Sequence, residues 1–64
     1  MLRLSLERQR RGLTQARAAQ KVGCGATTFS KVEQSVYVPR KGSPLGNRLE
    51  RVFSLQLRRL LSEV

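Results

Sequence analysis

The chain has 64 residues, of which thirteen are Lys or Arg and only four are acidic, so its formal net charge is +9 and its pI is near 11.7. This length allows one small domain and excludes a second, because so short a chain buries only about 60% of its surface on folding. Since the sequence has no Asp and no His, a catalytic carboxylate pair, a catalytic triad or a metal site lacks its residues, and we expect no enzyme activity, metal or cofactor.

The positive charge runs along the chain from Arg3 to Arg59 and is not confined to one end. It predicts a polyanionic partner: nucleic acid first, then an anionic membrane surface, and an acidic protein third. Cys24 is the only cysteine, which excludes an intrachain disulfide, and no apolar run approaches the ~20 residues of a membrane span. We therefore expect a folded protein of a reducing cytoplasm, without a membrane partner.

The first predicted helix covers residues 2–11 and ends at Gly12, a residue type favoured just past a helix C-terminus. Leu2, Leu4 and Leu6 alternate as they would in a strand. The Glu-Arg-Gln-Arg-Arg run that follows them favours a helix instead.

Two further helices are predicted on either side of a short turn. Thr14 is a good N-cap for a helix over 15–22, and Gly23 ends that helix. Gly25 can start the next one, over 26–34, in which apolar side chains fall on one flank and polar ones on another. Two short helices joined at a tight glycine turn form the helix-turn-helix arrangement. Cys24 is expected to point inward under that turn.

The rest of the chain is predicted as a loop followed by apolar helix. Residues 35–44 contain both prolines and the basic pair Arg40-Lys41, which is typical of a loop. Residues 45–64 place apolar side chains three and four positions apart. They form either one amphipathic helix or two helices separated at 54–56.

Several short motifs together carry a family resemblance: Leu13-Thr14-Gln15, Ala19, Lys21-Val22-Gly23 and Thr28-Phe29-Ser30-Lys31-Val32-Glu33. From about residue 4 to 61 the chain resembles the lambdoid phage repressor and Cro family, the xenobiotic-response-element-type helix-turn-helix DNA-binding domains. The resemblance implies an all-α, compact five-helix lambda-repressor-like bundle. It also implies a single domain over 1–64 with its helix-turn-helix core at 14–34.

The resemblance implies a double-stranded DNA partner and a recognition helix over 26–34. The expected base contacts come from Ala26, Thr27, Thr28, Ser30 and Lys31. The expected phosphate contacts come from Arg8, Thr14, Gln15, Gln34, Ser35, Tyr37, Arg40 and Lys41. The alternative is that these are ordinary solvated helix and loop positions, with Thr14 serving only as a cap.

The family also implies an ion pair between Arg8 and Glu33, which would fix the recognition helix against the first helix. Other positions depart from the family pattern. Ala18 stands where Leu is usual and Glu7 where an apolar residue is frequent, which indicates a re-packed or leaner core, with Phe29 a candidate to fill the space at Ala18.

The turns around the recognition helix depart from the pattern too. Gly25 lacks the side-chain acceptor of the usual Ser or Thr cap. Ser35 and Ser54 occupy positions where Gly is common, so different local turns are expected there.

The function predicted from this resemblance is a small dimeric Cro-like repressor, of phage or bacterial origin, that occludes a promoter at a palindromic operator. No length is left for a ligand-sensing domain, so no small-molecule ligand is expected. The expected dimer interface is Leu57, Leu60, Leu61 and Val64, and the alternative is that these residues close the monomer core. A dimer would place its recognition helices about 34 Å apart.

Other functions remain open at this point. A restriction-modification controller or an antitoxin-type regulator uses the same kind of domain. A cationic membrane-active peptide is suggested by the arginines beside the apolar stripe of 45–64. RNA binding is disfavoured because the only aromatic side chains, Phe29, Tyr37 and Phe53, offer no stacking platform.

Overall fold

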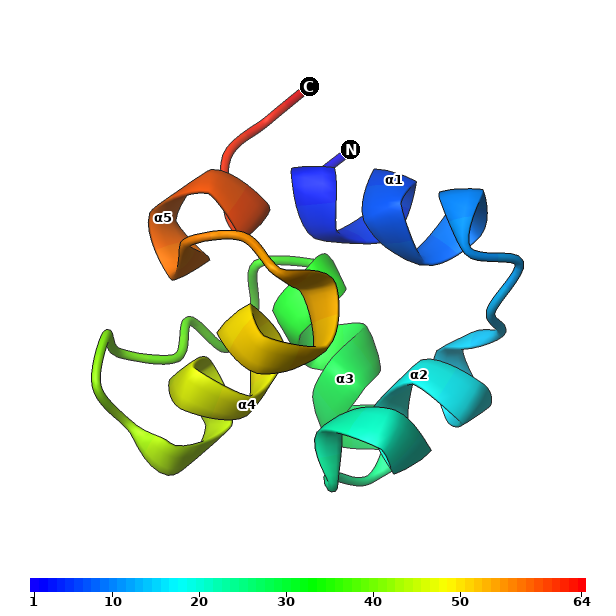
Figure 1. Ribbon diagram of the computed structural model, residues 1–64, viewed down its shortest axis with the longest axis horizontal. Coiled ribbons are helices and arrows are strands. Elements are labelled where there is room, and N and C mark those ends of the chain that lie inside the picture. Colours follow the sequence, from blue (N-terminus) through cyan, green and yellow to red (C-terminus); the bar gives the residue numbers. More distant parts are fainter.

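Five short helices follow one another along the chain, and a computed structural model describes all 64 residues. The helices are α1 (Arg3–Arg10), α2 (Gln15–Val22), α3 (Ala26–Glu33), α4 (Pro44–Phe53) and α5 (Leu57–Leu60). Figure 1 shows α1 above the α2 and α3 pair, α4 in front of α3, and α5 near the two chain ends. The expected all-α bundle of five helices is confirmed.

Side-chain caps begin two of the helices. Thr14 Oγ1 accepts a hydrogen bond from the Arg17 N–H at 3.1 Å, as its position predicted. Ser43 Oγ accepts from the Gly46 N–H at 3.0 Å, and Pro44 takes the first helical position, where its missing N–H costs nothing. These caps satisfy N–H groups that no helical carbonyl can reach, and so define where α2 and α4 start.

The chain bends sharply between α2 and α3. Gly23 has φ +87°, in the left-handed region that a Cβ disfavours. The N–H groups of Gly23 and Cys24 both donate to the Ala19 carbonyl, at 2.8 and 3.0 Å. Gly25 is the N-cap of α3 and offers no side-chain acceptor. The tight glycine turn predicted for the helix-turn-helix core is therefore present.

Two serines take the backbone geometry that usually calls for glycine. Ser35 has φ +61° and Ser54 has φ +55°, so both turns keep a left-handed residue despite the missing glycine, against the expectation of different local turns. The left-handed Ser54 ends α4, and Glu50 Oε2 then accepts a hydrogen bond from the Leu57 N–H, at 2.7 Å, in the first turn of α5. Residues 45–64 therefore form two helices and not one.

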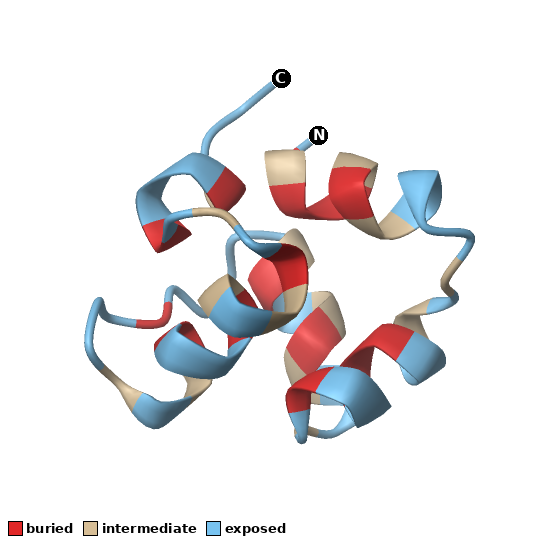
Figure 2. Ribbon diagram, in the orientation of Figure 1, coloured by how far each residue is buried: buried red, intermediate tan, exposed pale blue.

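The core draws on every helix, and Figure 2 shows the buried positions facing one another at the centre of the bundle. The buried apolar residues are Leu2, Leu4, Ala18, Ala19, Val22, Phe29, Val32, Leu49, Phe53, Leu57 and Leu60. Ala18 is fully covered, so its small side chain leaves no opening to solvent. None of the helices is long and apolar enough to cross a membrane.

The two ends of the chain pair with each other, which the sequence did not predict. The Arg3 N–H donates to the Ser62 carbonyl at 2.8 Å, and the Val64 N–H donates to the Met1 carbonyl at 3.0 Å. These bonds flank a single antiparallel bridge between Leu2 and Glu63. The pairing holds the start of α1 beside α5, where both ends lie close together in Figure 1.

Candidate nucleic-acid interface

The outer flank of α3 carries the side chains expected to contact bases, which are Ala26, Thr27, Thr28, Ser30 and Lys31. Ala26, Thr27 and Lys31 are exposed, and the other two are half-buried. The opposite flank points into the core through Phe29 and Val32, each 1% exposed. Because only one flank of α3 packs in the core, its polar flank stays exposed along the length of the helix. The major groove of DNA is wide enough to admit an α-helix.

A hydrogen-bonded network fixes α3 against α1 and the start of α2. Arg8 Nε donates to Glu33 Oε2 at 2.7 Å, with the two side chains only 15% and 6% exposed. Arg8 Nη1 also donates to the Leu13 carbonyl at 2.8 Å. Gln15 Nε2 donates to the other carboxylate oxygen, Glu33 Oε1, at 2.7 Å. Glu33 therefore ties three helices together at the C-terminal end of α3.

The bond from Gln15 to Glu33 joins residues 18 positions apart and was not predicted from the sequence. The amide nitrogen of Gln15 carries two hydrogens, and Glu33 takes one of them. The second N–H makes no hydrogen bond within the chain, and Gln15 is the first residue of α2, where the helix dipole favours negative charge. The network thus sets the orientation of a side chain that we expected at a phosphate.

The loop after α3 is folded back onto that helix and onto α4. The N–H groups of Val36 and Tyr37 both donate to the Lys31 carbonyl, at 2.9 and 3.2 Å. Ser43 Oγ donates to the Arg40 carbonyl at 2.7 Å, and that carbonyl oxygen lies 2.6 Å from where a Cβ on Gly46 would sit. The close approach requires glycine at this position and places the Arg40 segment against the first turn of α4.

The residues expected at phosphates differ in how free they are. Gln34, Ser35, Tyr37, Arg40 and Lys41 are all exposed and follow directly after α3. Thr14 is exposed, but its hydroxyl oxygen is occupied as the cap of α2. Arg8 donates from Nε and Nη1 to partners inside the protein, and its side chain is only 15% exposed. The structure therefore brings the loop residues together on the surface and assigns Arg8 mainly to the fold.

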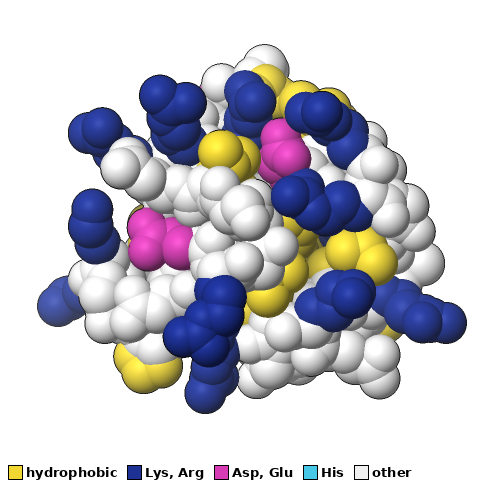
Figure 3. Space-filling model, viewed as in Figure 1, with side chains coloured by type: hydrophobic (Ala, Val, Ile, Leu, Met, Phe, Trp, Pro, Cys, Tyr) yellow, Lys and Arg dark blue, Asp and Glu magenta, His cyan; other side chains and the backbone are white.

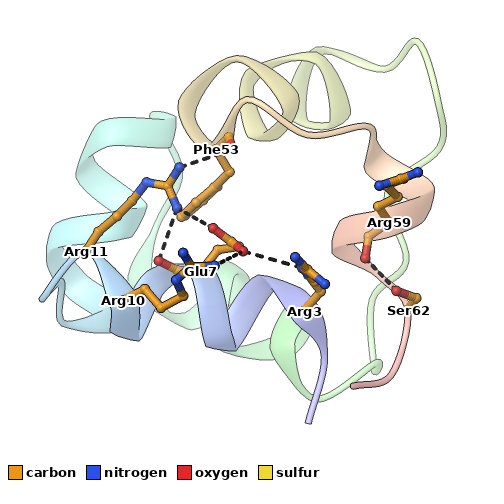
Figure 4. Close-up of polar contacts among 7 residues, drawn as sticks. All are labelled: Arg3, Glu7, Arg10, Arg11, Phe53, Arg59 and Ser62. Atoms are coloured by element: carbon orange, nitrogen blue, oxygen red, sulfur yellow. Dashed lines mark hydrogen bonds and ion pairs between the residues drawn. The ribbon is translucent and has the colours of Figure 1, made fainter.

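A second cluster of charges lies on α1, around Glu7 (Figure 4). The Glu7 carboxylate is 8% exposed and has arginine nitrogens at 2.8 Å (Arg11), 3.3 Å (Arg10) and 3.4 Å (Arg3). Arg11 Nη2 also donates to the Phe53 carbonyl at 3.2 Å, and its guanidinium lies 5.2 Å from the centre of that ring. The apolar position of the resembled family is thus filled by a carboxylate that arginines neutralise.

The hydrogen bond from Arg11 is the largest influence on Glu7, and it lowers the pKa of this carboxyl below its ordinary value of 4.5. Burial acts in the opposite direction, and the nearby charges of Arg10, Arg11 and Arg3 lower the pKa further. The spacing of these arginines, at i−4, i+3 and i+4 from Glu7, was visible in the sequence as a signal for such a cluster.

The remaining cations have no carboxylate partner. Of the thirteen Lys and Arg residues, only the four arginines of residues 3–11 form ion pairs, which leaves nine unpaired. The unpaired cations are Arg17, Lys21, Lys31, Arg40, Lys41, Arg48, Arg51, Arg58 and Arg59. In Figure 3, Lys and Arg side chains spread over the whole visible face, with few acidic groups between them. Most of the net charge of +9 therefore lies outside residues 3–11, where nine cations meet only three glutamates.

Two of the four leucine and valine residues expected at a dimer interface lie in the core of this chain, which fits the alternative that they close the monomer core. Leu57 is 3% exposed and Leu60 is fully buried, because both close the core of a single copy. Neither side chain has surface left for a second chain. Leu61 is half-buried, and Val64 is 56% exposed.

Cys24 packs against the core beneath the helix-turn-helix bend, and it is only partly buried. Burial raises the pKa of its thiol, and the charge of Arg48 opposes that effect. A raised pKa disfavours the thiolate, which is the reactive form. The geometry is that of a small apolar side chain under the turn.

A comparison with known families accords with this geometry. A family model described as a helix-turn-helix domain matches residues 2–52, which covers α1 to α3 and nearly all of α4. No curated protein and no solved structure matches the chain. With the bend at Gly23 and the free flank of α3, the match over most of the sequence shows that the chain belongs to the helix-turn-helix family of DNA-binding domains.

Proposed function

We propose that this protein is a small Cro-like transcription regulator that binds a specific double-stranded DNA site and represses by occluding a promoter. The observation that carries the proposal is the exposed polar flank of α3, held in orientation by Arg8, Glu33 and Gln15. Such a helix fits the major groove with its N-terminal residues toward base edges. The nine unpaired cations supply the attraction to phosphate.

Within this proposal the side chains of α3 divide into two roles. We expect Lys31 to donate to guanine O6 or N7, and Thr27 and Ser30 to exchange hydrogen bonds with base edges. The methyl group of Ala26 suits a thymine methyl. We expect Gln15, with the exposed loop residues that follow α3, to hold the backbone and carry no base preference.

We propose that two copies bind one operator. The Cα positions extend over 25 × 24 × 22 Å. Two copies placed side by side, with their side chains in contact, can therefore bring their α3 helices to a spacing near that of one DNA turn, about 34 Å. A stable interface buries about 800 Å² per partner, far more than Leu61 and Val64 can supply. We therefore expect the dimer to be weak in free solution and to form on a palindromic site.

A membrane-active peptide is the competing function of a different class. That function needs residues 1–44 to be incidental, but the core joins both halves of the chain, with Phe29 and Val32 buried alongside Leu49 and Phe53. We therefore expect full helicity in buffer and no change on adding anionic vesicles, whereas a membrane peptide gains helicity there. A restriction-modification controller or an antitoxin-type regulator would use the same DNA contacts, and neighbouring genes distinguish them.

Selection of bound sites from a pool of random duplexes tests the proposal directly. We expect enrichment of two inverted half-sites centred about one DNA turn apart. The Lys31→Ala variant should lose discrimination at one position of each half-site by about 1–3 kcal/mol. A pool that stays random after selection contradicts sequence-specific binding. Unchanged discrimination by the Lys31 variant contradicts the assigned reading flank.

A further inference from the structure

A hollow lies beside the recognition helix, between α3, the loop that follows it and the first turn of α4. Its volume is about 420 Å³, and it is lined by Thr28, Lys31, Val36, Tyr37 and Leu45. Three of these five side chains are hydrophobic. The hollow therefore places three apolar side chains beside two residues of the flank that we expect to read bases.

The loop beside the hollow also carries the largest run of exposed apolar side chains. Val36 is 69% exposed, Tyr37 46% and Val38 62%, and these residues are consecutive. The other large exposed apolar side chains, Met1 and Val64, lie at the chain ends. Of these three residues only Tyr37 is an expected DNA contact, and Val36 and Val38 have no role in the DNA binding proposed above. Contiguous exposed apolar groups beside a concave surface are typical of a site that binds another molecule.

One cation lines the hollow, and two more lie on the loop that contributes to it. The lining cation is Lys31 of α3, and Arg40 and Lys41 belong to the loop between α3 and α4; none of the three is paired with a carboxylate. The Arg40 carbonyl is bonded to Ser43 Oγ at 2.7 Å, which keeps this segment next to Leu45 in the first turn of α4. A ligand that suits both features has a bulky apolar group flanked by negative charges.

A second copy of this chain does not meet that requirement. A two-fold interface here would bring Lys31, Arg40 and Lys41 of one copy against those of the other. Each of the four glutamates already has a partner within the fold: Glu7 and Glu33 in the arginine networks, Glu50 at the Leu57 N–H, and Glu63 at the Met1 amino group. Charge complementarity therefore points to a partner of different composition.

Duplex DNA matches the cations near the hollow but not its apolar side chains. Its phosphates suit the cations, but its outer surface offers an apolar hollow only thymine methyl groups and sugar edges. A protein segment can present a phenylalanine or leucine side chain between carboxylates. We propose that the hollow binds an acidic protein segment through one bulky apolar side chain. Because Thr28, Lys31 and Tyr37 line the hollow and are also expected DNA contacts, such a segment competes with DNA.

A matched pair of peptides tests whether the hollow binds an apolar side chain. The first is a short glutamate-rich peptide with phenylalanine and leucine at its centre, and the second has serines in their place. We expect the apolar-centred peptide to bind the full chain at least about tenfold more tightly, as burial of one such side chain allows. It should shift the NMR methyl signals of Val36 and Leu45 and displace a bound duplex at lower concentration than the serine-centred peptide.

Two single substitutions on the same loop distinguish binding in the hollow from nonspecific binding to any exposed apolar side chain. Val36 lines the hollow, whereas Val38 is similarly exposed and does not line it. We expect Val36→Ser to abolish the advantage of the apolar-centred peptide and Val38→Ser to keep it. Both variants should bind duplex DNA as the parent does.

Each other outcome overturns the proposal. Equal binding of the two peptides means that charge alone attracts them. Loss of duplex affinity in Val36→Ser, with none in Val38→Ser, means that DNA occupies the hollow. Peptide binding that leaves the duplex bound removes the competition. The direct peptide-binding measurements and the NMR shifts need no DNA, so a failed site selection would contradict the proposed regulator without deciding this inference.

Discussion

The arginines of α1 and the cations of the remaining chain do different work, although they are the same kinds of residue. Arg3, Arg8 and Arg10 of α1, together with Arg11 just after it, all form ion pairs with the buried carboxylates Glu7 and Glu33. The nine cations outside this segment have no carboxylate partner. The N-terminal arginines thus hold the fold together, and the others provide the positive surface.

The role of a cation in this protein follows from where the few acidic residues are placed. A buried pair is costly to break, because removal of one partner leaves the other charge without compensation. An exposed cation contributes little to stability and much to the attraction of a polyanion. Counting basic residues overestimates the surface available for DNA, since four of the thirteen are engaged in the protein.

The largest effect is expected from Glu33→Ala, which would turn Arg8 into an unpaired cation that is still largely buried. We expect a loss of about 3–5 kcal/mol in the free energy of unfolding, together with weaker DNA binding. Chemical denaturation measures the first and fluorescence anisotropy the second. Because the free energy of unfolding of so small a domain is only a few kcal/mol, the variant should be mostly unfolded at about 37 °C.

Two further variants keep that prediction sharp. Glu33→Gln retains one oxygen acceptor for Arg8 or Gln15 and should fall between the parent and the alanine variant. Glu63→Ala removes an ion pair whose carboxylate is 74% exposed, so it should cost less than about 0.5 kcal/mol. Equal losses in Glu33→Ala and Glu63→Ala would show that the buried network contributes no more than a surface pair.

The Gly46→Ala substitution should displace the backbone of Arg40, which is one of the unpaired cations. The new Cβ would lie 2.6 Å from the Arg40 carbonyl oxygen and 3.0 Å from Leu57 Cδ2. We expect a net loss of about 1–3 kcal/mol despite the better helix propensity of alanine, with a lowered melting temperature. Asn47→Ala, on the exposed side of the same helix, is the control and should change stability by a few tenths of a kcal/mol at most. A Gly46→Ala variant as stable as the parent would mean that the loop containing Arg40 can shift at almost no cost in free energy.

Neutralising one cation from each set tests the comparison itself. Arg40→Gln should leave the melting temperature unchanged and reduce the slope of log K against log salt by about 1, because one phosphate contact is lost. Arg11→Gln should lower the melting temperature, since Arg11 bonds both Glu7 and the Phe53 carbonyl. Its salt slope should stay the same. The reverse pattern would contradict the division between paired and unpaired arginines.

The pH dependence of stability should report on Glu7. Its pKa is lowered in the folded state, chiefly by the Arg11 hydrogen bond, so the unfolded chain binds the proton more readily. The resulting stabilisation is fully present above about pH 4.5, the ordinary value for this carboxyl, and is lost as the pH falls through the lower folded value. Melting temperature against pH measures it. Glu7→Gln should flatten the curve in that acid range, and an identical acid slope in both proteins would contradict the assignment.

The local elements were well predicted from the sequence. The cap at Thr14, the left-handed Gly23 and the start of α3 after Gly25 all depend on residues within a few positions of one another. The contact between Arg8 and Glu33, implied by the family resemblance, is also made in the structure. The free flank of α3 followed from its two-sided pattern, which places Phe29 and Val32 inside.

The interactions that were missed join distant parts of the chain. Gln15 reaches Glu33 across 18 positions, and Arg11 reaches the Phe53 carbonyl across 42. The arginine spacing around Glu7 could have suggested the cluster, but its burial depends on α4 packing over α1. The burial of Leu57 and Leu60 likewise depends on the break at Ser54, which turns α5 back onto the core.

By itself the sequence determined the first three helices to within one residue at each end, the tight bend and the excess of positive charge, because these follow from neighbouring residues and from composition. Only the tertiary structure decided which arginines are free to meet DNA, which leucines are available to a second copy and where an apolar hollow opens. Those outcomes depend on which distant side chains come into contact when the five helices share one small core.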